Sequence, residues 1–419
     1  MATTSADSIE IARAEPGEFR RGWKVVTAAL IGIGCGLSPL PFYTMGVFAP
    51  HLISSFGWSV AEVMAGLMIT TFAVVVGAPL AGALSEKYGT RPVALASIVL
   101  FGLSFMSMAL LQGSLVQFYL TWGVIALVGS GTLPITFTRT VNSWFDKRRG
   151  IALGLAMSGT GLFGILCKPY LAWVIGNWGW RAGYAAIGAI PLVLALPLAI
   201  AWFREPSGAA RQHMTQAEKR TGLTRGEALK GARFWIIALA MLIVSFALGG
   251  PVPNLEGILK DRGFDAATAL SLTPLIGLSA IGGRIIGGLL LDRFWAPAVA
   301  FVILGLPSLA CWLLSQGNYD VGTAAFAILM IGFALGIEYD VLAYLTSRYF
   351  GLKAYSGLYA ILYVFFALGS GVAPLVFGRI KDVTHGYGPA LLTSAIALPL
   401  AAALFLLLGR YPRFEEDAA

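Results

Sequence analysis

Long apolar stretches alternate with short polar segments along the whole chain. Six apolar stretches precede a polar segment at residues 203–233, and six more follow it. About 20 apolar residues span the hydrocarbon core of a bilayer as a helix, and a helix satisfies its own backbone hydrogen bonds in lipid. The pattern predicts an all-α membrane protein with twelve transmembrane helices. We expect these helices near residues 24–50, 59–83, 92–112, 115–141, 150–175, 182–202, 234–256, 266–290, 295–315, 321–346, 354–378 and 388–408.

The same pattern predicts two halves joined by a linker. We expect a tail at 1–22, a six-helix half at 23–202, a linker at 203–233, a second six-helix half at 234–408 and a tail at 409–419. The end of the linker, TRGEALKGARFW, is typical of an amphipathic helix that lies at the membrane surface.

Matching motifs recur at a constant interval. Gly82-x-Leu84-x-Glu86-Lys87 returns 206 residues later as Gly288-x-Leu290-x-Asp292-Arg293. The same interval separates Gly57-Trp58-Ser59 from Gly263-Phe264-Asp265, whose last residues are suitable N-caps for the helices that follow. Such repeats indicate two pseudo-symmetric halves with a binding site between them, near the middle of the membrane.

Composition excludes a soluble protein and explains the charge. The chain is 57% hydrophobic and 12% charged, whereas a soluble domain carries about 25% charged residues. Of the 29 lysines and arginines, we place 21 on one side of the membrane and 5 on the other; Arg139, Lys168 and Arg284 remain within the spans. The positive-inside rule then predicts that both termini are cytoplasmic. The net charge of +8 therefore needs no nucleic-acid partner.

Sequence motifs of catalysis are missing. The chain has no GxxxxGK[ST], HExxH, GxSxG or Cys/His cluster, and its three cysteines fall within predicted spans. We therefore expect no enzyme activity, no cofactor and no metal. The polar segments are too short for a signalling domain. The short loops and the lack of an N-x-S/T acceptor favour a bacterial inner membrane.

Arg284 is the most informative single residue. It lies inside an apolar helix-length run among Gly282, Gly283, Gly287 and Gly288. An arginine at bilayer depth costs roughly 2.5–3.5 kcal/mol on insertion scales, so it is a functional hypothesis by default. Its planar fork of five donors matches a carboxylate bidentately. We predict that Arg284 anchors an anionic substrate; a helix-pairing role is the alternative.

Other charged residues fall within predicted spans. Arg139 lies six residues before Phe145 and either faces the substrate site or extends to the cytoplasm. Lys168 either reaches the external surface or lies within the cavity as a charge partner. Glu338 and Asp340 are about 200° apart on one helix, so they cannot share a face. If Arg139 faces the cavity, Asp340 and its repeat-related neighbour Tyr344 face it too, and Glu338 packs elsewhere, although the reverse stays open. Either acid could bind a coupling proton or form a structural ion pair.

Polar aromatic and amide side chains near helix breaks complete the set of candidates. Tyr43 follows two prolines in the first span, and Asn254 follows two in the seventh. Broken helices expose backbone groups only where they line a cavity. We therefore name, as substrate contacts besides the arginines, Tyr43, Asn254, Tyr344, Tyr359 and Tyr363, with packing as the alternative role.

The loop after the second span, GALSEKYGTRPVAL, resembles the signature loop GxLxDRxGRR of the major facilitator superfamily. A second copy, GLLLDRFWAP, has Trp295 where the superfamily has Gly. The resemblance implies that an acid in each loop, Glu86 and Asp292, locks against a neighbouring helix and sets the gating equilibrium; ordinary loop charge is the alternative. The residues expected in the gating loops are Gly82, Glu86, Lys87, Gly89, Arg91, Asp292 and Arg293.

Two longer motifs resemble one branch of that superfamily, the monocarboxylate transporters and oxalate:formate antiporters. They are WFDKRRGIALGLAMSGTGLFGILCKP and RYFGLKAYSGLYAILYVFFALGSGVAP. Arg284 stands eight residues before Asp292, where the branch carries the arginine that pairs with the substrate carboxylate. The acid that the branch carries four residues before this arginine is Ala280 here, and the eleventh-span lysine of the oxalate exchanger has no counterpart in 354–378.

The sequence thus predicts a secondary active transporter, working by alternating access with proton symport or anion exchange. The expected substrate is a small organic anion, a monocarboxylate. Uptake or efflux of a larger aromatic, vitamin-like or drug-like solute is the alternative. We expect a multi-pass monomer in the lipid bilayer, with protons as the coupling ion of the symport.

Overall fold

The computed structural model describes residues 18–145, 149–205, 222–317, 319–351, 353–412 and 414. The expected tail at 1–22, the linker at 203–233 and the C-terminal tail therefore lie partly outside the described residues. The described part is all helical apart from one isolated bridge between Gly222 and Gly351.

Helices before the linker form the first helix group. They are α1 (Glu18–Gly34), α2 (Pro39–Phe56), α3 (Val60–Tyr88), α4 (Thr90–Ser107), α5 (Leu115–Gly129), α6 (Pro134–Trp144), α7 (Arg149–Met157), α8 (Gly159–Ile190) and α9 (Leu196–Trp202), with the short 3-10 helices η1 (Met108–Leu110) and η2 (Ser130–Thr132) and the π-helix η3 (Pro191–Ala195).

Helices after the linker form the second helix group. They are α11 (Arg225–Lys230), α12 (Ala232–Gly249), α13 (Leu255–Asp261), α14 (Ala266–Leu272), α15 (Pro274–Arg293), α16 (Ala296–Gly305), α17 (Pro307–Ser315), α18 (Val321–Phe350), α19 (Tyr355–Thr384) and α20 (Gly388–Leu406). The short helix α11 occupies the segment for which the sequence predicts an amphipathic helix.

Polar side chains start the helices where the sequence predicts N-caps. Ser59 accepts a hydrogen bond from the Glu62 amide, and Glu62 accepts one from the Ser59 amide, which makes a capping box at the start of α3. Asp265 caps α14 by accepting from the Thr268 amide, and this hydrogen bond holds the pKa of Asp265 below its usual value.

Prolines divide two of the apolar stretches. Pro39 and Pro41 open α2 after a non-helical turn that follows α1, and Pro251 and Pro253 lie in the turn between α12 and α13. Proline has no N–H to donate and clashes with the preceding helical turn. The carbonyl groups near these breaks are therefore released from regular helix hydrogen bonding.

Eleven helical stretches in the described chain are long and apolar enough to cross a membrane. One of them, Ile151–Trp202, contains 52 residues. Its backbone departs from helical geometry at Gly179, with φ 82° and ψ 169°. A positive φ is unfavourable for residues other than glycine, so Gly179 supplies the break within this stretch.

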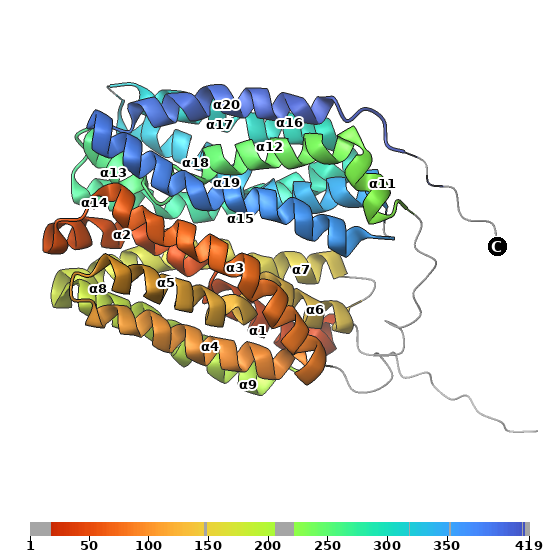
Figure 1. Ribbon diagram of the computed structural model, residues 1–419, viewed down its shortest axis with the longest axis horizontal. Coiled ribbons are helices and arrows are strands. Elements are labelled where there is room, and N and C mark those ends of the chain that lie inside the picture. Colours follow the sequence, from red (N-terminus) through yellow and green to blue (C-terminus); the bar gives the residue numbers. More distant parts are fainter. Residues whose placement is uncertain are drawn as a thin grey trace, which may run out of the picture.

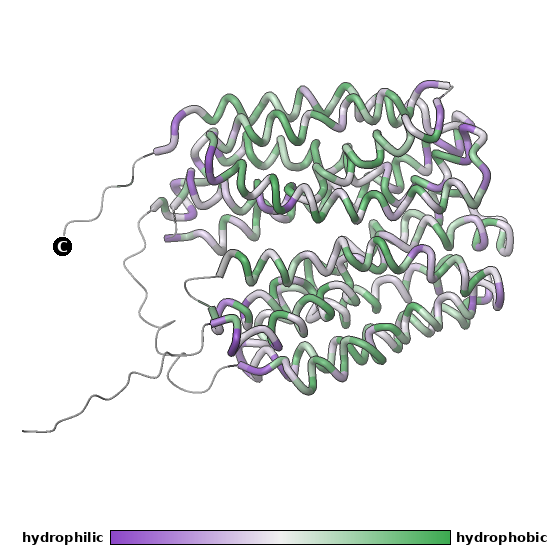
Figure 2. Tube along the Cα trace, turned by 180° about the vertical axis from the view of Figure 1, so that it is seen from behind, coloured by the Kyte–Doolittle hydropathy of each residue, from purple (hydrophilic) through white to green (hydrophobic). Residues whose placement is uncertain are grey.

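The two helix groups lie side by side in Figure 1, the first below and the second above. Helix α3 packs along α19, and α8 packs along α15, so these four helices form much of the boundary. The chain enters α1 and leaves α20 at the same end of the bundle (Figure 1). Hydrophilic residues gather at the two ends, whereas apolar residues cover the length of the helices (Figure 2).

Candidate functional site

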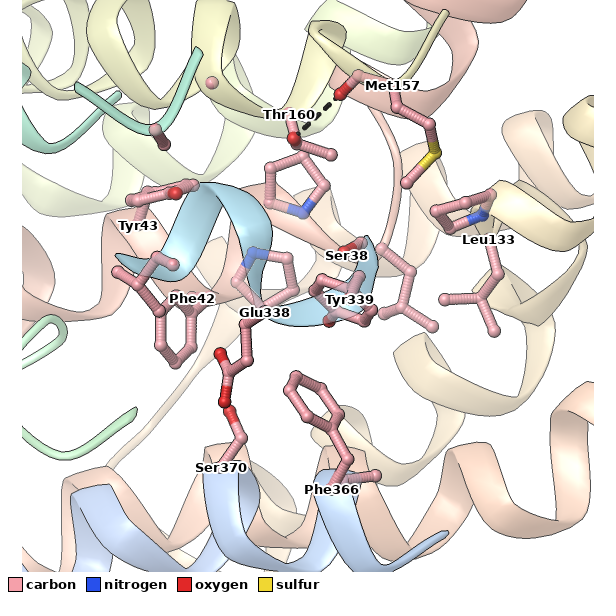
Figure 3. Close-up of a pocket in the computed structure, with 18 of the residues that line it drawn as sticks. Ser38, Phe42, Tyr43, Leu133, Met157, Thr160, Glu338, Tyr339, Phe366 and Ser370 are labelled. Carbon is pink, nitrogen blue, oxygen red and sulfur yellow. Dashed lines mark hydrogen bonds between the residues drawn. The ribbon is translucent and has the colours of Figure 1, made fainter. Parts of the chain in front are cut away.

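A cavity of about 180 Å³ lies between the two helix groups. One water molecule needs about 10–15 Å³ by this measure, so the cavity has room for a small organic solute. Residues of α2, α3, α6, α7 and α8 line one side, and residues of α15, α18 and α19 line the other. Figure 3 shows Tyr43, Tyr339 and Phe366 among the side chains that surround this space. The cavity therefore occupies the boundary where the sequence predicts the binding site.

Arg284 lines the cavity from α15. Its Nε donates to the Gly336 carbonyl at 3.3 Å, and its Nη1 donates to the Met157 carbonyl at 2.7 Å. The Asp340 carboxylate lies 3.5 Å from Nε. Arg284 thus joins a backbone carbonyl of each helix group with one carboxylate of α18.

Small residues bring α15 and α18 close enough for these contacts. A Cβ at Gly283 would collide with the Phe333 backbone, and a Cβ at Gly336 would collide with the Ala280 backbone. Close approach of helices through small residues is a common means of packing in membranes. The glycines around Arg284 therefore fix the position of its guanidinium against α18.

Part of the Arg284 guanidinium makes no hydrogen bond among the described residues. The group has five N–H donors, and the structure gives its Nη2 no hydrogen bond among the described residues. The Arg284 side chain is 12% exposed, and that of Asp340 is 37% exposed. The resemblance noted above places an acid at position 280, where this chain has alanine; Asp340 supplies a carboxylate to Arg284 from a different helix.

Glu338 also lines the cavity, and it is buried. Its carboxyl group lies toward Ser370 of α19 (Figure 3). Its Oε1 has no hydrogen-bond partner among the described residues. An ionised carboxylate in such surroundings is costly without a cation or a donor, so Glu338 is a site where a proton can be held.

The orientation of α18 is thus the reverse of the one favoured from the sequence. Glu338 faces the cavity, and Asp340 turns toward Arg284 of α15. Arg139 is exposed on α6 and does not line the cavity. Tyr344 lies beside Arg348, whose guanidinium is 5.9 Å from the ring centre. Arg139 and Tyr344 occupy equivalent positions in the repeat, but this equivalence does not set the direction of Asp340. Asp340 instead pairs with Arg284 of α15.

Tyrosines of α19 form a stack that leads to the cavity. Ring centres are 5.8 Å apart for Tyr355 and Tyr359, 6.2 Å for Tyr359 and Tyr363, and 5.6 Å for Tyr363 and Phe366. Tyr363 and Phe366 line the cavity, as does Tyr43 from α2, whereas Tyr355 and Tyr359 lie outside its lining. The predicted tyrosines therefore divide into two that line the cavity and others that do not.

Asn254 does not line the cavity. Its amide nitrogen donates to the carbonyls of Gly250 at 2.9 Å and Pro374 at 3.5 Å, and its oxygen accepts from the Tyr387 hydroxyl at 3.2 Å. Burial raises the pKa of Tyr387, which keeps that hydroxyl a donor. Asn254 thus holds the proline-broken turn between α12 and α13 against α19.

Lys168 makes a buried ion pair that the sequence pattern does not predict. Its side chain is 0% exposed, and its Nζ lies 2.7 Å from Glu256 Oε1 of α13. It neither reaches the surface nor lines the cavity. A Cβ at Gly46 would collide with the Glu256 carboxylate, so the glycine provides the space for this pair. The sequence feature that could have indicated this pair is Glu256, an acid close to the two prolines of the seventh predicted span.

Replacing Lys168 with methionine is expected to lower the free energy of unfolding by about 3–5 kcal/mol, because it leaves a buried carboxylate without its cation. Thermal unfolding of purified protein measures this loss. The double variant Lys168→Met, Glu256→Gln is expected to recover most of it. The control is Asp261→Asn, which removes the partner of Lys381 in a more exposed pair and should cost about 1 kcal/mol or less. Equal losses in Lys168→Met and the control would contradict a buried role.

The predicted gating loops lie at the end of the bundle where the chain enters α1. Gly89 ends α3 with φ 92°, a conformation that favours glycine. Arg91 donates to the Ile200 carbonyl at 2.6 Å, and Thr90 hydrogen-bonds Glu205, so the first loop is tied to its own helix group. The remaining charged residues are exposed: Glu86, Lys87, Asp292 and Arg293. Gly82 is exposed as well, with open space beside it.

Comparison with known proteins gives consistent results. The family model described as Major Facilitator Superfamily matches residues 31–374. The chain is 28% identical to monocarboxylate transporter 13 of Bos taurus, over 97% of this chain and 94% of that protein. It is 26% identical to monocarboxylate transporter 11 of Homo sapiens, over 95% and 85%.

A further relative and a solved structure extend the likeness. An uncharacterized 38 kDa protein of Thermoproteus tenax is 30% identical over 86% of this chain and 90% of its own length. The crystal structure of a bacterial homologue of the human lysosomal transporter Spinster superposes with a TM-score of 0.67 at 16% identity, over 93% of this chain and 96% of that one. The chain belongs to the major facilitator superfamily and is a multi-pass membrane transporter rather than an enzyme.

Proposed function

We propose that the protein is a secondary transporter of a small organic anion, a monocarboxylate, and that it works by alternating access. The observation that carries this proposal is Arg284, a cation in an otherwise mostly apolar cavity between the two helix groups. Its Nη2 is free to bind a carboxylate, and its other nitrogens hold it in place. The relatives named monocarboxylate transporters support the same substrate class.

We further propose twelve spans in two six-helix halves. The stretch Ile151–Trp202 would measure about 78 Å as one helix at 1.5 Å per residue, whereas the hydrocarbon core is about 30 Å thick. Folding back at Gly179 makes two spans of it, and the eleven stretches become twelve. An even number agrees with a chain that enters and leaves at one end (Figure 1). The distribution of lysine and arginine makes that end cytoplasmic.

Coupling and gating follow from the positions of the acids. We assign proton binding to Glu338, with Asp340 as the carboxylate that neutralises Arg284 when no substrate is bound. Lys168 acts through its ion pair rather than in the cavity. The exposed signature loops, with Glu86 and Asp292, are assigned to locking the cytoplasmic end when the cavity opens outward. We place the protein as a monomer in a bacterial inner membrane.

The tyrosine stack favours a second candidate substrate, a larger aromatic or vitamin-like solute. Four rings, from Tyr355 to Phe366, follow one face of α19 to the cavity. Such rings offer flat apolar surface on which an aromatic solute can stack. In this alternative Arg284 recognises one polar group of the solute, and the tyrosines bind its ring.

A thermal-shift screen distinguishes the two candidates. Wild type and Arg284→Ala are compared against monocarboxylates, dicarboxylates, aromatic acids, vitamins and neutral drugs. A ligand at 100 times its dissociation constant adds about 2.7 kcal/mol of stability. We expect small monocarboxylates to stabilise wild type and not the variant. Stabilisation of both proteins by neutral aromatic solutes alone would instead support the second candidate.

A further inference from the structure

The ion pair of Lys168 and Glu256 connects the two helix groups. Lys168 belongs to α8 in the first group, and Glu256 belongs to α13 in the second. The pair lies beyond the cavity, since Gly161 of α8 lines the cavity and Lys168 comes two turns later. Helix α13 lies at the end of the bundle opposite to the entry of α1 (Figure 1). The pair therefore lies on the side of the cavity that faces away from the termini.

A second contact crosses the boundary at the same end. Asp382 of α19 accepts hydrogen bonds from the amides of Val60 at 3.2 Å and Ala61 at 2.9 Å, which start α3. A carboxylate at a helix N-terminus is favoured by the free amides and the helix dipole. Gly378 permits this approach, because a Cβ there would collide with the backbone of Ala61. Two acids of the second group thus hold two helices of the first.

The two buried charges of this pair must separate from each other when the outer end opens. Both side chains are buried, and Glu256 Oε2 has no hydrogen-bond partner among the described residues. If the helix groups separate at this end, each charge must leave the other, and neither is stable alone in apolar surroundings. The closed arrangement and a water-filled open one are therefore favoured over partly opened states.

We propose that Lys168 and Glu256 form the outer gate of the transport cycle, the contact whose separation opens the cavity to the outside. This inference rests on the proposed alternating access and adds the residues that hold one of its states. The charge pair holds the outer end closed, so leaving one charge without its partner shifts the population toward outward-open molecules, in which water surrounds that charge. Asp382 supports the closed state as a helix cap next to the pair.

The test measures distances at both ends of the full-length protein in lipid nanodiscs. Cys35, Cys167 and Cys311 are replaced by alanine, and spin labels are attached to an outer pair of exposed positions or to an inner pair. The outer pair is Ser55 and Ala267, and the inner pair is Lys87 and Lys353. Electron–electron double resonance then gives the populations of open and closed ends.

Lys168→Met is the main variant, because it leaves Glu256 without its cation in the closed state. We expect its ratio of outward-open to outward-closed molecules to rise roughly tenfold or more, with the inner distance shortening. Lys168→Met, Glu256→Gln leaves no unpaired buried charge, so it should fold and keep a ratio close to that of wild type. The exchanged pair Lys168→Glu, Glu256→Lys restores the attraction and should return toward wild type. Asp261→Asn breaks an ion pair within the second helix group and should leave both distances unchanged.

Wild-type distances in folded Lys168→Met, or an equal shift in Asp261→Asn, would overturn the gate. The thermal-shift screen tests the proposed function separately from the gate. If the protein binds carboxylates through Arg284 but its outer end does not change, only the proposed gate is wrong. If the expected shift occurs but no anion binds, only the proposed substrate is wrong.

Discussion

Replacing Arg284 with lysine is expected to weaken carboxylate binding by about 10- to 100-fold. Lysine keeps the positive charge but lacks the planar fork that binds both carboxylate oxygens. It also cannot hold Gly336, Met157 and an anion in the geometry that the guanidinium gives. Each factor of ten corresponds to about 1.4 kcal/mol, so the expected loss is about that of one hydrogen bond to a charged group. Titration calorimetry with the best carboxylate from the screen measures it.

Arg139→Lys is the matched control for this prediction. Arg139 is an exposed arginine of α6 outside the cavity lining, so the same chemical change there should leave affinity within about twofold. Arg284→Ala should lose more than Arg284→Lys, because the charge is lost as well. Undiminished carboxylate affinity in Arg284→Lys would show that the guanidinium serves helix packing and not substrate binding.

Replacing Glu338 with glutamine is expected to abolish proton-driven accumulation while exchange continues. A symporter that moves one proton with each monocarboxylate accumulates it up to about tenfold for each pH unit of gradient, because one unit is worth 1.36 kcal/mol. Glutamine matches the shape of Glu338 but cannot take up or release a proton. Accumulation in proteoliposomes should therefore fall to a ratio of about one. Exchange of labelled for unlabelled substrate should persist, since it needs no net proton movement.

Asp340→Asn and Asp265→Asn are the comparison variants for the Glu338→Gln prediction. Asp340 pairs with Arg284, so its loss should alter substrate affinity more than the accumulation ratio. Asp265 is an exposed N-cap outside the cavity, and asparagine caps helices equally well, so that variant should behave as wild type. Full accumulation in both Glu338→Gln and Asp340→Asn would show that neither acid carries the proton.

Periodicity, proline positions and caps predicted the helices well, because these depend on residues close together in the chain. The capping residues Ser59 and Asp265 and the proline breaks are where the sequence indicates them. Arg284 lines the cavity, as the charge within its apolar span indicates, whereas Glu338 lines it in place of the favoured Asp340. The superfamily was recognisable from the loop motifs, and the family comparison confirms it.

Contacts between distant helices could not be predicted in the same way. Spacing shows that Glu338 and Asp340 point in different directions, but not which neighbour stands on each side. The Lys168–Glu256 pair joins residues 88 positions apart on helices that only the tertiary fold brings together. The prolines before Asn254 suggest a ligand contact there. In the structure, the Asn254 amide instead donates a hydrogen bond to the Gly250 carbonyl in the proline-broken turn.

The glycine contacts between α15 and α18 have a consequence for how new substrate preferences could arise. Any side chain at Gly283 or Gly336 would push the two helices apart and move Arg284 with them, so this face offers evolution little room for change. Tyr43 and Tyr363 instead line the cavity with their side chains, so a change of ring size there alters the cavity without adding atoms between α15 and α18. Laboratory selection for a different acid should therefore accumulate substitutions at Tyr43 and Tyr363 while leaving the anion anchor and its glycines intact.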